Sequence, residues 1–226
     1  MNQRPTHRRF RPSALLALLP VLAGACNIIG AAASRAPKPD ILAAYKGLSN
    51  HSVGVVVWAD RSLITDWPNL RIDMGNSIMS KLKTAQAAAG KDSKELLGTT
   101  FPYPAASFVK YQKDHPGLDA LPITDVAPRL GVDRLIYIEV NDFSTRADGS
   151  IALYLGKIDV AMKIIEVEGG KGKSAYDEGS VKSQFPDKAT KEGVLNSSDR
   201  AIYGGTVDAI TTDIVTRLIT HPDDSP

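Results

Sequence analysis

The pattern of hydrophobic and polar positions along the chain predicts alternating strands and helices. Residues 52–58, Ser-Val-Gly-Val-Val-Val-Trp, form a short β-branched run typical of a buried strand. In residues 69–89 the apolar side chains recur every three or four positions, which predicts an amphipathic helix ending at Gly90. Residues 133–140 alternate between two faces and predict a second core strand.

The less regular segments predict shorter elements. They are a loop at residues 60–68, a short strand at 96–101, a helix at 105–114 and a helix at 122–130. Thr124 or Asp125 could cap the last of these helices, and Pro128 limits its regularity.

The C-terminal half predicts two further strands. Residues 151–167 alternate, with a change of parity at Gly156 that predicts a bulge. A turn at Gly169-Gly170 leads to a more polar strand at residues 174–185, which is expected at the periphery of the sheet.

A final helix is predicted from Ser198-Asp199, either of which could cap it, to about Thr220. Its apolar stripe repeats every four positions: Ile202, Thr206, Ile210, Ile214 and Leu218.

Together these elements predict a mixed α/β fold. We expect a single mixed β-sheet of about four or five strands with helices packed on it, in the order β-α-α-β-β-β-α. The two core strands are joined through helices, which favours a parallel crossover, and the later hairpins add antiparallel strands.

The N-terminus has the layout of an export signal. Residues 1–25 contain four arginines and no acid, followed by an apolar run. That run is shorter than the ~20 residues of a transmembrane helix. Cys26, the only cysteine, follows the small residues Gly24 and Ala25. The segment resembles a bacterial lipoprotein signal, in which such a cysteine is lipidated; a plain signal peptide is the alternative.

Lipidation of Cys26 implies a protein that acyl chains hold at a membrane, facing the periplasm. In the lipoproteins that this signal resembles, an Asp after the cysteine retains the protein at the inner membrane. Asn27 stands there instead, which favours the outer membrane.

The predicted organisation therefore has four parts. They are a signal peptide (residues 1–25), a lipidated N-terminus and tether (26–50), a mixed α/β domain (51–222) and a C-terminal tail (223–226). The whole chain has 27 basic and 25 acidic residues; four of the bases lie in the signal, so the remainder has 23 bases against 25 acids. This balance disfavours a nucleic-acid partner, because such binding needs many cations for the phosphates.

No motif predicts catalysis, a metal or a cofactor. Lys171-Gly-Lys-Ser174 resembles a phosphate loop, but Val167 replaces the required glycine and a strand is expected next, so a Gly-rich hairpin turn is the better interpretation. The histidines outside the signal show no metal-ligand spacing.

Four acidic residues cluster in sequence near the second core strand: Asp133, Glu139, Asp142 and Asp148. A carboxylate pair for glycoside cleavage is conceivable, although such residues more often cap turns or keep strand edges soluble. Strand alternation could bury Glu139 beside Tyr137, in which case it would need a partner such as Arg134 or Lys163.

Aromatic residues fall on or beside the loops that follow the first strand and first helix. Beside Trp58, the candidate partner-binding residues are Trp67, Phe101, Tyr103 and Tyr111. The carboxyl ends of parallel strands are the usual ligand crevice of an open α/β sheet. Each of these rings could instead be a lid on the core.

With this element order, the chain resembles the CsgG-like envelope lipoproteins, the lipoprotein activators of penicillin-binding proteins and the N-terminal domain of TolB. The resemblance is carried by the lipoprotein start, the strand from Val53 and the stretch Leu130-Gly-Val-Asp-Arg-Leu-Ile-Tyr-Ile138. It departs at residues 96–104, where the family often has an arginine-containing junction. A membrane pore is disfavoured, because residues 174–185 have too few outward apolar side chains for a barrel strand.

The resemblance implies a non-enzymatic lipoprotein that binds another envelope component through sheet-end loops or an exposed strand edge. Two alternatives remain: an accessory lipoprotein of an envelope lipid or solute transporter, and a hydrolase without a recognisable signature.

Overall fold

The computed structural model describes residues 39–89, 94–186 and 192–223. Residues 40–221 form one compact unit. Outside this unit, the backbone N–H of Asp223 donates to the carbonyl of Pro39 at 3.1 Å. Within the described ranges, no helix is long and apolar enough to cross a membrane.

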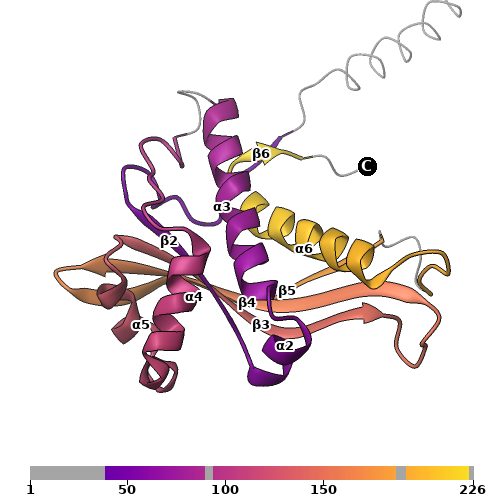
Figure 1. Ribbon diagram of the computed structural model, residues 1–226. Helices are drawn as coiled ribbons and strands as arrows, with labels where there is room; N and C mark the ends of the chain where they lie inside the picture. Colours follow the sequence, from indigo (N-terminus) through magenta and orange to yellow (C-terminus); the bar gives the residue numbers. More distant parts are fainter. Residues whose placement is uncertain (1–38, 90–93, 187–191, 224–226) are drawn as a thin grey trace, which may run out of the picture. The chain divides into compact units, whose positions relative to one another are not determined.

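A four-stranded mixed sheet is the centre of this compact unit (Figure 1). Its strand order is β2 (Val53–Ala59), β3 (Arg134–Arg146), β4 (Tyr154–Glu168) and β5 (Lys171–Phe185). β2 pairs with β3 in parallel, whereas β3, β4 and β5 are antiparallel. The mixed α/β class, the parallel crossover and the peripheral place of the most polar strand are thus confirmed.

The remaining elements are helices, turns and two short strands. They are α2 (Arg61–Asp66), α3 (Leu70–Ala89), α4 (Ala105–Asp114), η1 (Pro116–Ala120), α5 (Ile123–Val126), η2 (Ala127–Leu130), α6 (Asp199–Thr216), and the short strands β1 (Asp40–Ile41) and β6 (His221–Pro222), which form a two-stranded sheet.

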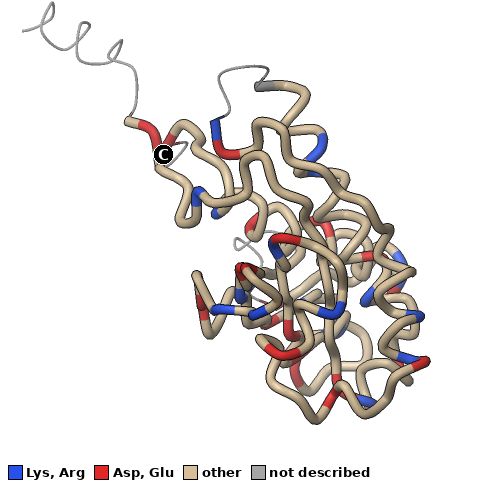
Figure 2. The backbone as a smooth tube through the Cα atoms, turned by 90° about the vertical axis from the view of Figure 1, so that its left-hand side faces the viewer, with Lys and Arg blue, Asp and Glu red and all other residues tan. Residues whose placement is uncertain are grey.

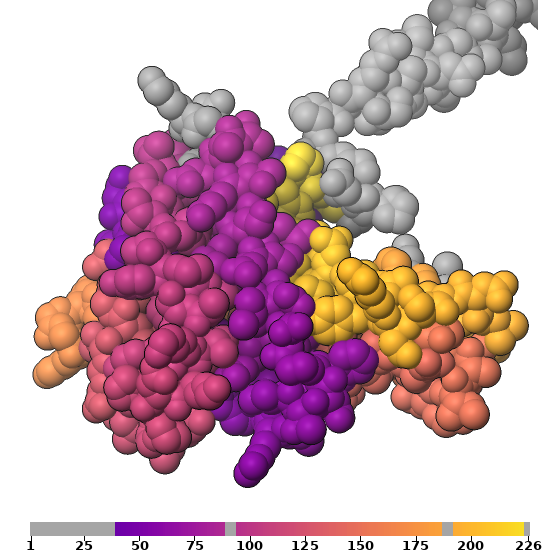
Figure 3. All heavy atoms as spheres, viewed as in Figure 1, coloured from indigo at the N-terminus to yellow at the C-terminus, as the bar shows by residue number. Residues whose placement is uncertain are grey.

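Helices α3 and α6 pack on one face of the sheet, and α4, α5 and η2 pack on part of the other. In the space-filling view the side chains of α3 and those of the α4–η2 segment form adjoining surfaces (Figure 3). The larger core, under α3 and α6, contains fully buried side chains such as Ile138, Met162 and Ile210. The smaller core, under α4 and α5, is built around Val56 and Phe108.

Helix α6 follows the predicted pattern. All five residues of its predicted stripe are 0 % exposed. Ser198 caps the helix, and its hydroxyl accepts from the backbone N–H of Ala201 at 3.2 Å. The helix ends at Thr216, one turn before the predicted end.

The bulge predicted at Gly156 is confirmed. Ser144 pairs with Lys157 but Arg146 pairs with Tyr154, so β4 contains one more residue than β3 in this interval. A Cβ at Gly156 would lie 1.7 Å from Oγ1 of Thr206, so only glycine allows α6 to approach β4 this closely.

Several shorter elements differ from the prediction. The predicted loop at residues 60–68 contains helix α2, because the Asp60 carboxylate accepts from the N–H of Leu63 at 2.8 Å and caps it. The predicted strand at 96–101 is a turn with a single bridge between Thr100 and Ser52.

The predicted helix at 122–130 is two short pieces, α5 and η2, and no side chain caps α5. Residue 151 was expected to begin a strand, but Ile151 is 94 % exposed and β4 begins at Tyr154.

The core also extends into the predicted tether. Leu48 is 0 % exposed and Tyr45 is 8 % exposed, and both pack in the larger core. The Tyr45 hydroxyl donates to Oε1 of Glu166 at 2.9 Å. The packed domain therefore begins before residue 51.

Candidate ligand-binding pocket

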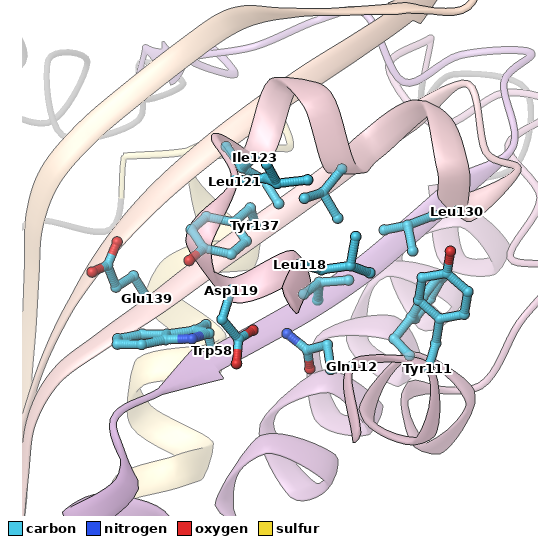
Figure 4. A pocket seen from close by; sticks show the side chains of 13 residues that line it. Trp58, Tyr111, Gln112, Leu118, Asp119, Leu121, Ile123, Leu130, Tyr137 and Glu139 are labelled. Carbon is cyan, nitrogen blue, oxygen red and sulfur yellow. The ribbon is translucent and has the colours of Figure 1, made fainter. Parts of the chain in front are cut away.

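A pocket of about 310 Å³ lies between the sheet and the α4–η2 segment (Figure 4). Its sheet wall is set by the parallel register, in which Val56 pairs with Tyr137 and Trp58 with Glu139. Side chains of alternate strand residues share one face, so these four side chains form a continuous surface. The opposite wall is one face of α4, from which Phe108, Tyr111 and Gln112 contribute at helical spacing, continued by η1 and α5.

The floor of the pocket is apolar. Val56 is 3 % exposed and Phe108 is 4 % exposed, and Ile123 and Leu130 pack against them. Glycine at position 54 is needed beneath this floor, because a Cβ there would lie 2.9 Å from Cζ of Phe108. Gly54 thus lets the Phe108 ring lie directly on β2.

The rim is polar, and most of its groups have no partner within the described part of the chain. No hydrogen bond or ion pair there involves the side chains of Trp58, Asp119, Tyr137 or Glu139. Figure 4 shows the carboxylates of Glu139 and Asp119 on either side of the Trp58 ring in that view. Burial raises the pKa of Tyr137, and the negative charges of Glu139 and Asp119 raise it further. Both carboxylates therefore act on the same phenol.

Arg71 lies behind this rim. Its Nη1 donates to Oε1 of Gln112 at 3.4 Å, while its Nε is buried without a hydrogen-bond partner. Burial lowers the pKa of Arg71, and the charge of Asp119 partly offsets that effect. Arg71 does not line the pocket, whose lining contains no Lys, Arg or His.

Some of the charges on the neighbouring sheet are paired. Lys163 lies 3.4 Å from Asp177, and Lys182 lies 3.5 Å from Asp159. Figure 2 shows Lys and Arg interspersed with Asp and Glu along the described chain. Other charged residues of the sheet share this state, because in the described chain no ion pair involves Glu139, Asp142, Lys171 or Lys173.

Neither partner foreseen for Glu139 contacts it. Lys163 pairs with Asp177. The Arg134 side chain turns the other way, where its Nε donates to the carbonyl of Gly47 at 3.1 Å and lies 3.9 Å from Glu166. Glu139 is half-buried, so water reaches it and a protein partner is not required.

The structure brings two of the four predicted partner-binding residues together. Tyr111 lines the pocket and stacks on His115, with ring centroids 4.3 Å apart. Tyr103 is 41 % exposed and packs edge-to-face on Phe108 at 5.9 Å. Both tyrosines border a second hollow of about 190 Å³ beside Arg129.

The other two lie elsewhere. Phe101 packs against the larger core, and Nζ of Lys83 lies 5.6 Å from its ring centroid. Trp67 also packs against the larger core, with its ring 5.1 Å from Phe143 and 5.5 Å from Tyr203. Trp67 therefore acts as a lid on the core.

Sequence reasoning missed Gln112 and Asp119 as pocket residues. Asp119 lies in the Pro-Gly-Leu-Asp-Ala turn of η1, where nothing in the local pattern points to a site. The alternating pattern of β2 and β3 could have indicated part of the pocket, because a parallel pairing in this register places Trp58 beside Glu139.

Three further predictions concern the Lys171–Ser174 segment, metal binding and Cys26. Lys171 begins β5 directly after the Gly169-Gly170 turn, where both glycines have positive φ angles of 56° and 75°, so the hairpin interpretation is confirmed. In the described ranges no group of three His, Cys, Asp or Glu side chains could hold a metal ion. Cys26 lies outside the described residues.

No protein-family model matches the chain, and no curated protein matches it. Similar solved structures include the lipoprotein GNA1162 from Neisseria meningitidis, with 20% identity over 72% of this chain and 96% of that one, at a TM-score of 0.41. The hypothetical protein CT253 from Chlamydia trachomatis has 16% identity over 75% of this chain and 96% of that one, at a TM-score of 0.43. The PelC dodecamer from Paraburkholderia phytofirmans has 8% identity over 81% of this chain and 98% of that one, at a TM-score of 0.40. At these TM-scores the likenesses carry no functional argument, and the CsgG-like resemblance stays a prediction.

Proposed function

We propose that the chain is a non-enzymatic lipoprotein, anchored in a bacterial membrane through Cys26 and facing the periplasm, that binds another component of the cell envelope. The observation that carries the binding role is the pocket between β2, β3 and the α4–η2 segment. It combines an apolar floor with polar groups that have no partner among the described residues, as binding sites do. The anchor rests on the charged segment, apolar run and cysteine of residues 1–26.

Lipidation is tested by Cys26→Ala. Radiolabelled palmitate should label the wild-type protein and not the variant, and the variant should leave the membrane fraction. Asn27→Asp is the matched control: it should keep the label and, if sorting follows the rule of the lipoproteins that the signal resembles, move to the inner membrane. A Cys26→Ala protein that still carries lipid would contradict the anchor.

Partner binding is tested by photo-crosslinking in intact cells. A photoreactive residue at Leu121, which is 38 % exposed and lines the pocket, should form an adduct with one envelope protein. The same residue at Leu195, which is 68 % exposed and lies outside the pocket lining, is the control. Equal adducts at both positions, or none at Leu121, would remove the pocket from the proposal.

An accessory role in solute transport is the second candidate, because about 310 Å³ lies at the lower end of the range for small-molecule pockets. This alternative predicts a small solute that co-purifies with the protein. Mass spectrometry of the material released on denaturation distinguishes it from a protein partner.

A further inference from the structure

We infer that the pocket takes a basic side chain, lysine or arginine, from a segment of a partner protein. The inference rests on the proposed function and names the chemical group that the partner presents. It is drawn from the charge and the aromatic lining of the pocket.

The first argument is charge complementarity. Asp119 and Glu139 lie in the lining, no basic side chain does, and neither carboxylate has an ion-pair partner in the described chain. The charge of Arg71, which lies outside the lining, acts on Asp119. Among the other acids of the sheet, Asp159 is paired with Lys182, whereas Asp142 has no ion pair in the described chain. A group with a positive charge would be attracted by both carboxylates, whereas an anion would be repelled by them.

The second argument is the aromatic surface between the carboxylates. Trp58 and Tyr137 line the pocket beside Glu139 and, in the view of Figure 4, beside Asp119. A cation within about 6 Å of an aromatic centroid is attracted by the ring, and tryptophan is the strongest such ring. The Tyr137 hydroxyl is not engaged within the described chain, so its oxygen can accept a hydrogen bond from a basic side chain, whereas Trp58 offers its ring face alone because the indole N–H is a donor.

The third argument is the apolar floor. Val56, Phe108 and Leu118 are at most 8 % exposed and offer a surface for methylene groups. Lysine and arginine carry a charged head on an apolar stem, and they lay that stem along apolar surface while the head seeks polar partners. A compact inorganic cation would leave this floor unused, and a purely apolar side chain would leave the two carboxylates unpaired.

The test uses the full-length lipidated protein, purified in detergent and labelled with ¹⁵N. Its two tryptophans give two indole N–H signals, which Trp58→Phe assigns. Capped lysine and capped arginine (the N-acetyl N′-methylamides) should shift the Trp58 signal with dissociation constants of about 1 mM. The Trp67 signal should stay in place, because that ring packs against the larger core and does not line the pocket.

Variants test the carboxylates. Glu139→Gln and Asp119→Asn keep the shape of the pocket and should each raise the dissociation constant about three- to fivefold. Asp125→Asn is the matched control, because Asp125 is an exposed acid of α5 outside the lining, and it should leave the constant unchanged.

Three outcomes would overturn the inference. Capped norleucine that binds as tightly as capped lysine would make the site apolar. Spermidine that binds more tightly than either capped residue would assign the pocket to free polyamines. A Trp58 signal that none of the probes moves would also overturn it. Adducts at Leu121 in cells, together with no response to the basic probes, would leave the proposed function standing and reject only the basic side chain.

Discussion

At the scale of single residues, charge-assisted hydrogen bonds join the end of the sheet to helix α6. Nη2 of Arg146 donates to Oδ2 of Asp199 at 2.7 Å, and its Nε donates to Oδ1 at 3.0 Å. The Thr145 hydroxyl donates to the same Oδ1 at 2.7 Å. The hydrogen bonds from Arg146 and then Thr145 hold the pKa of Asp199 below its usual 3.8.

This lowered pKa makes a prediction about acid stability. A carboxyl whose pKa is lower in the folded state stabilises the fold fully above its unfolded pKa, near 4, and loses that contribution as the pH falls through the folded value. Asp199→Asn should therefore lower the free energy of unfolding at pH 7 by about 0.5 to 1 kcal/mol, since the Asp199 side chain is 48 % exposed and solvent weakens the pair. Urea unfolding at pH 7 and pH 3 measures the effect.

The difference between Asp199→Asn and wild type should shrink at pH 3. Asp125→Asn is again the control, because Asp125 is exposed and its side chain makes no hydrogen bond or ion pair in the described chain. An equal loss at both pH values would show that the Asp199 charge contributes nothing.

At the scale of elements, α6 shows how the packing of a helix depends on individual positions. The buried stripe of α6 could be predicted from the sequence, because side chains four positions apart lie on the same face of a helix. Its adjacent glycines look equivalent in the sequence but differ in the fold. A Cβ at Gly205 would lie 2.4 Å from the Phe185 ring, whereas nothing lies within 4 Å of a Cβ at Gly204.

The two alanine substitutions should therefore have opposite signs. Gly204→Ala should raise the free energy of unfolding by about 0.5 to 1 kcal/mol, because alanine is the better helix former. Gly205→Ala should lower it by about 1 to 3 kcal/mol, because the new methyl group overpacks against Phe185. Each serves as the control for the other in thermal or urea unfolding. Two substitutions with the same sign would contradict this packing.

The edge strand β5 bears on how a partner could bind. It has register shifts relative to β4 between Val160 and Met162 and between Ile164 and Ile165, and it carries charges along its length. Bulges and charged side chains are the usual means by which an edge strand avoids pairing with another chain. Of the two predicted binding modes, the loops and helices beside the sheet therefore have more structural support than the strand edge.

At the scale of the whole molecule, the packed domain includes residues that the sequence placed in the tether. The Thr99 hydroxyl donates to the carbonyl of Leu48 at 2.8 Å, and the N–H of Ala44 donates to the carbonyl of Arg217 at 2.8 Å. Burial, and then the hydrogen bond to Glu166, raise the pKa of Tyr45 to about 12. These contacts connect residues 44–48 to distant parts of the chain.

A chain shortened to begin at residue 51 should therefore be much less stable than one that begins at residue 40. Loss of the buried Leu48 side chain alone should cost about 2 to 5 kcal/mol, and the hydrogen bonds of residues 44 to 48 are lost as well. Urea unfolding of the two shortened chains compares them directly. Equal urea midpoints for the two shortened chains would show that the domain begins at residue 51, as the sequence predicts.

The sequence by itself determined the core strands, the long helices, the hairpin turn, the bulge at Gly156 and the mixed α/β class. These features depend on the spacing of neighbouring residues, which reports the face that each element buries. The export signal and Cys26 are likewise local patterns. Only the tertiary structure decided the pocket, because its walls come from the parallel register of Trp58 with Glu139 and from the η1 turn that carries Asp119. The structure also showed that Trp67 packs against the larger core, beside Phe143 and Tyr203. The sequence could not decide this, because the same aromatic residue can face a partner or cover the core.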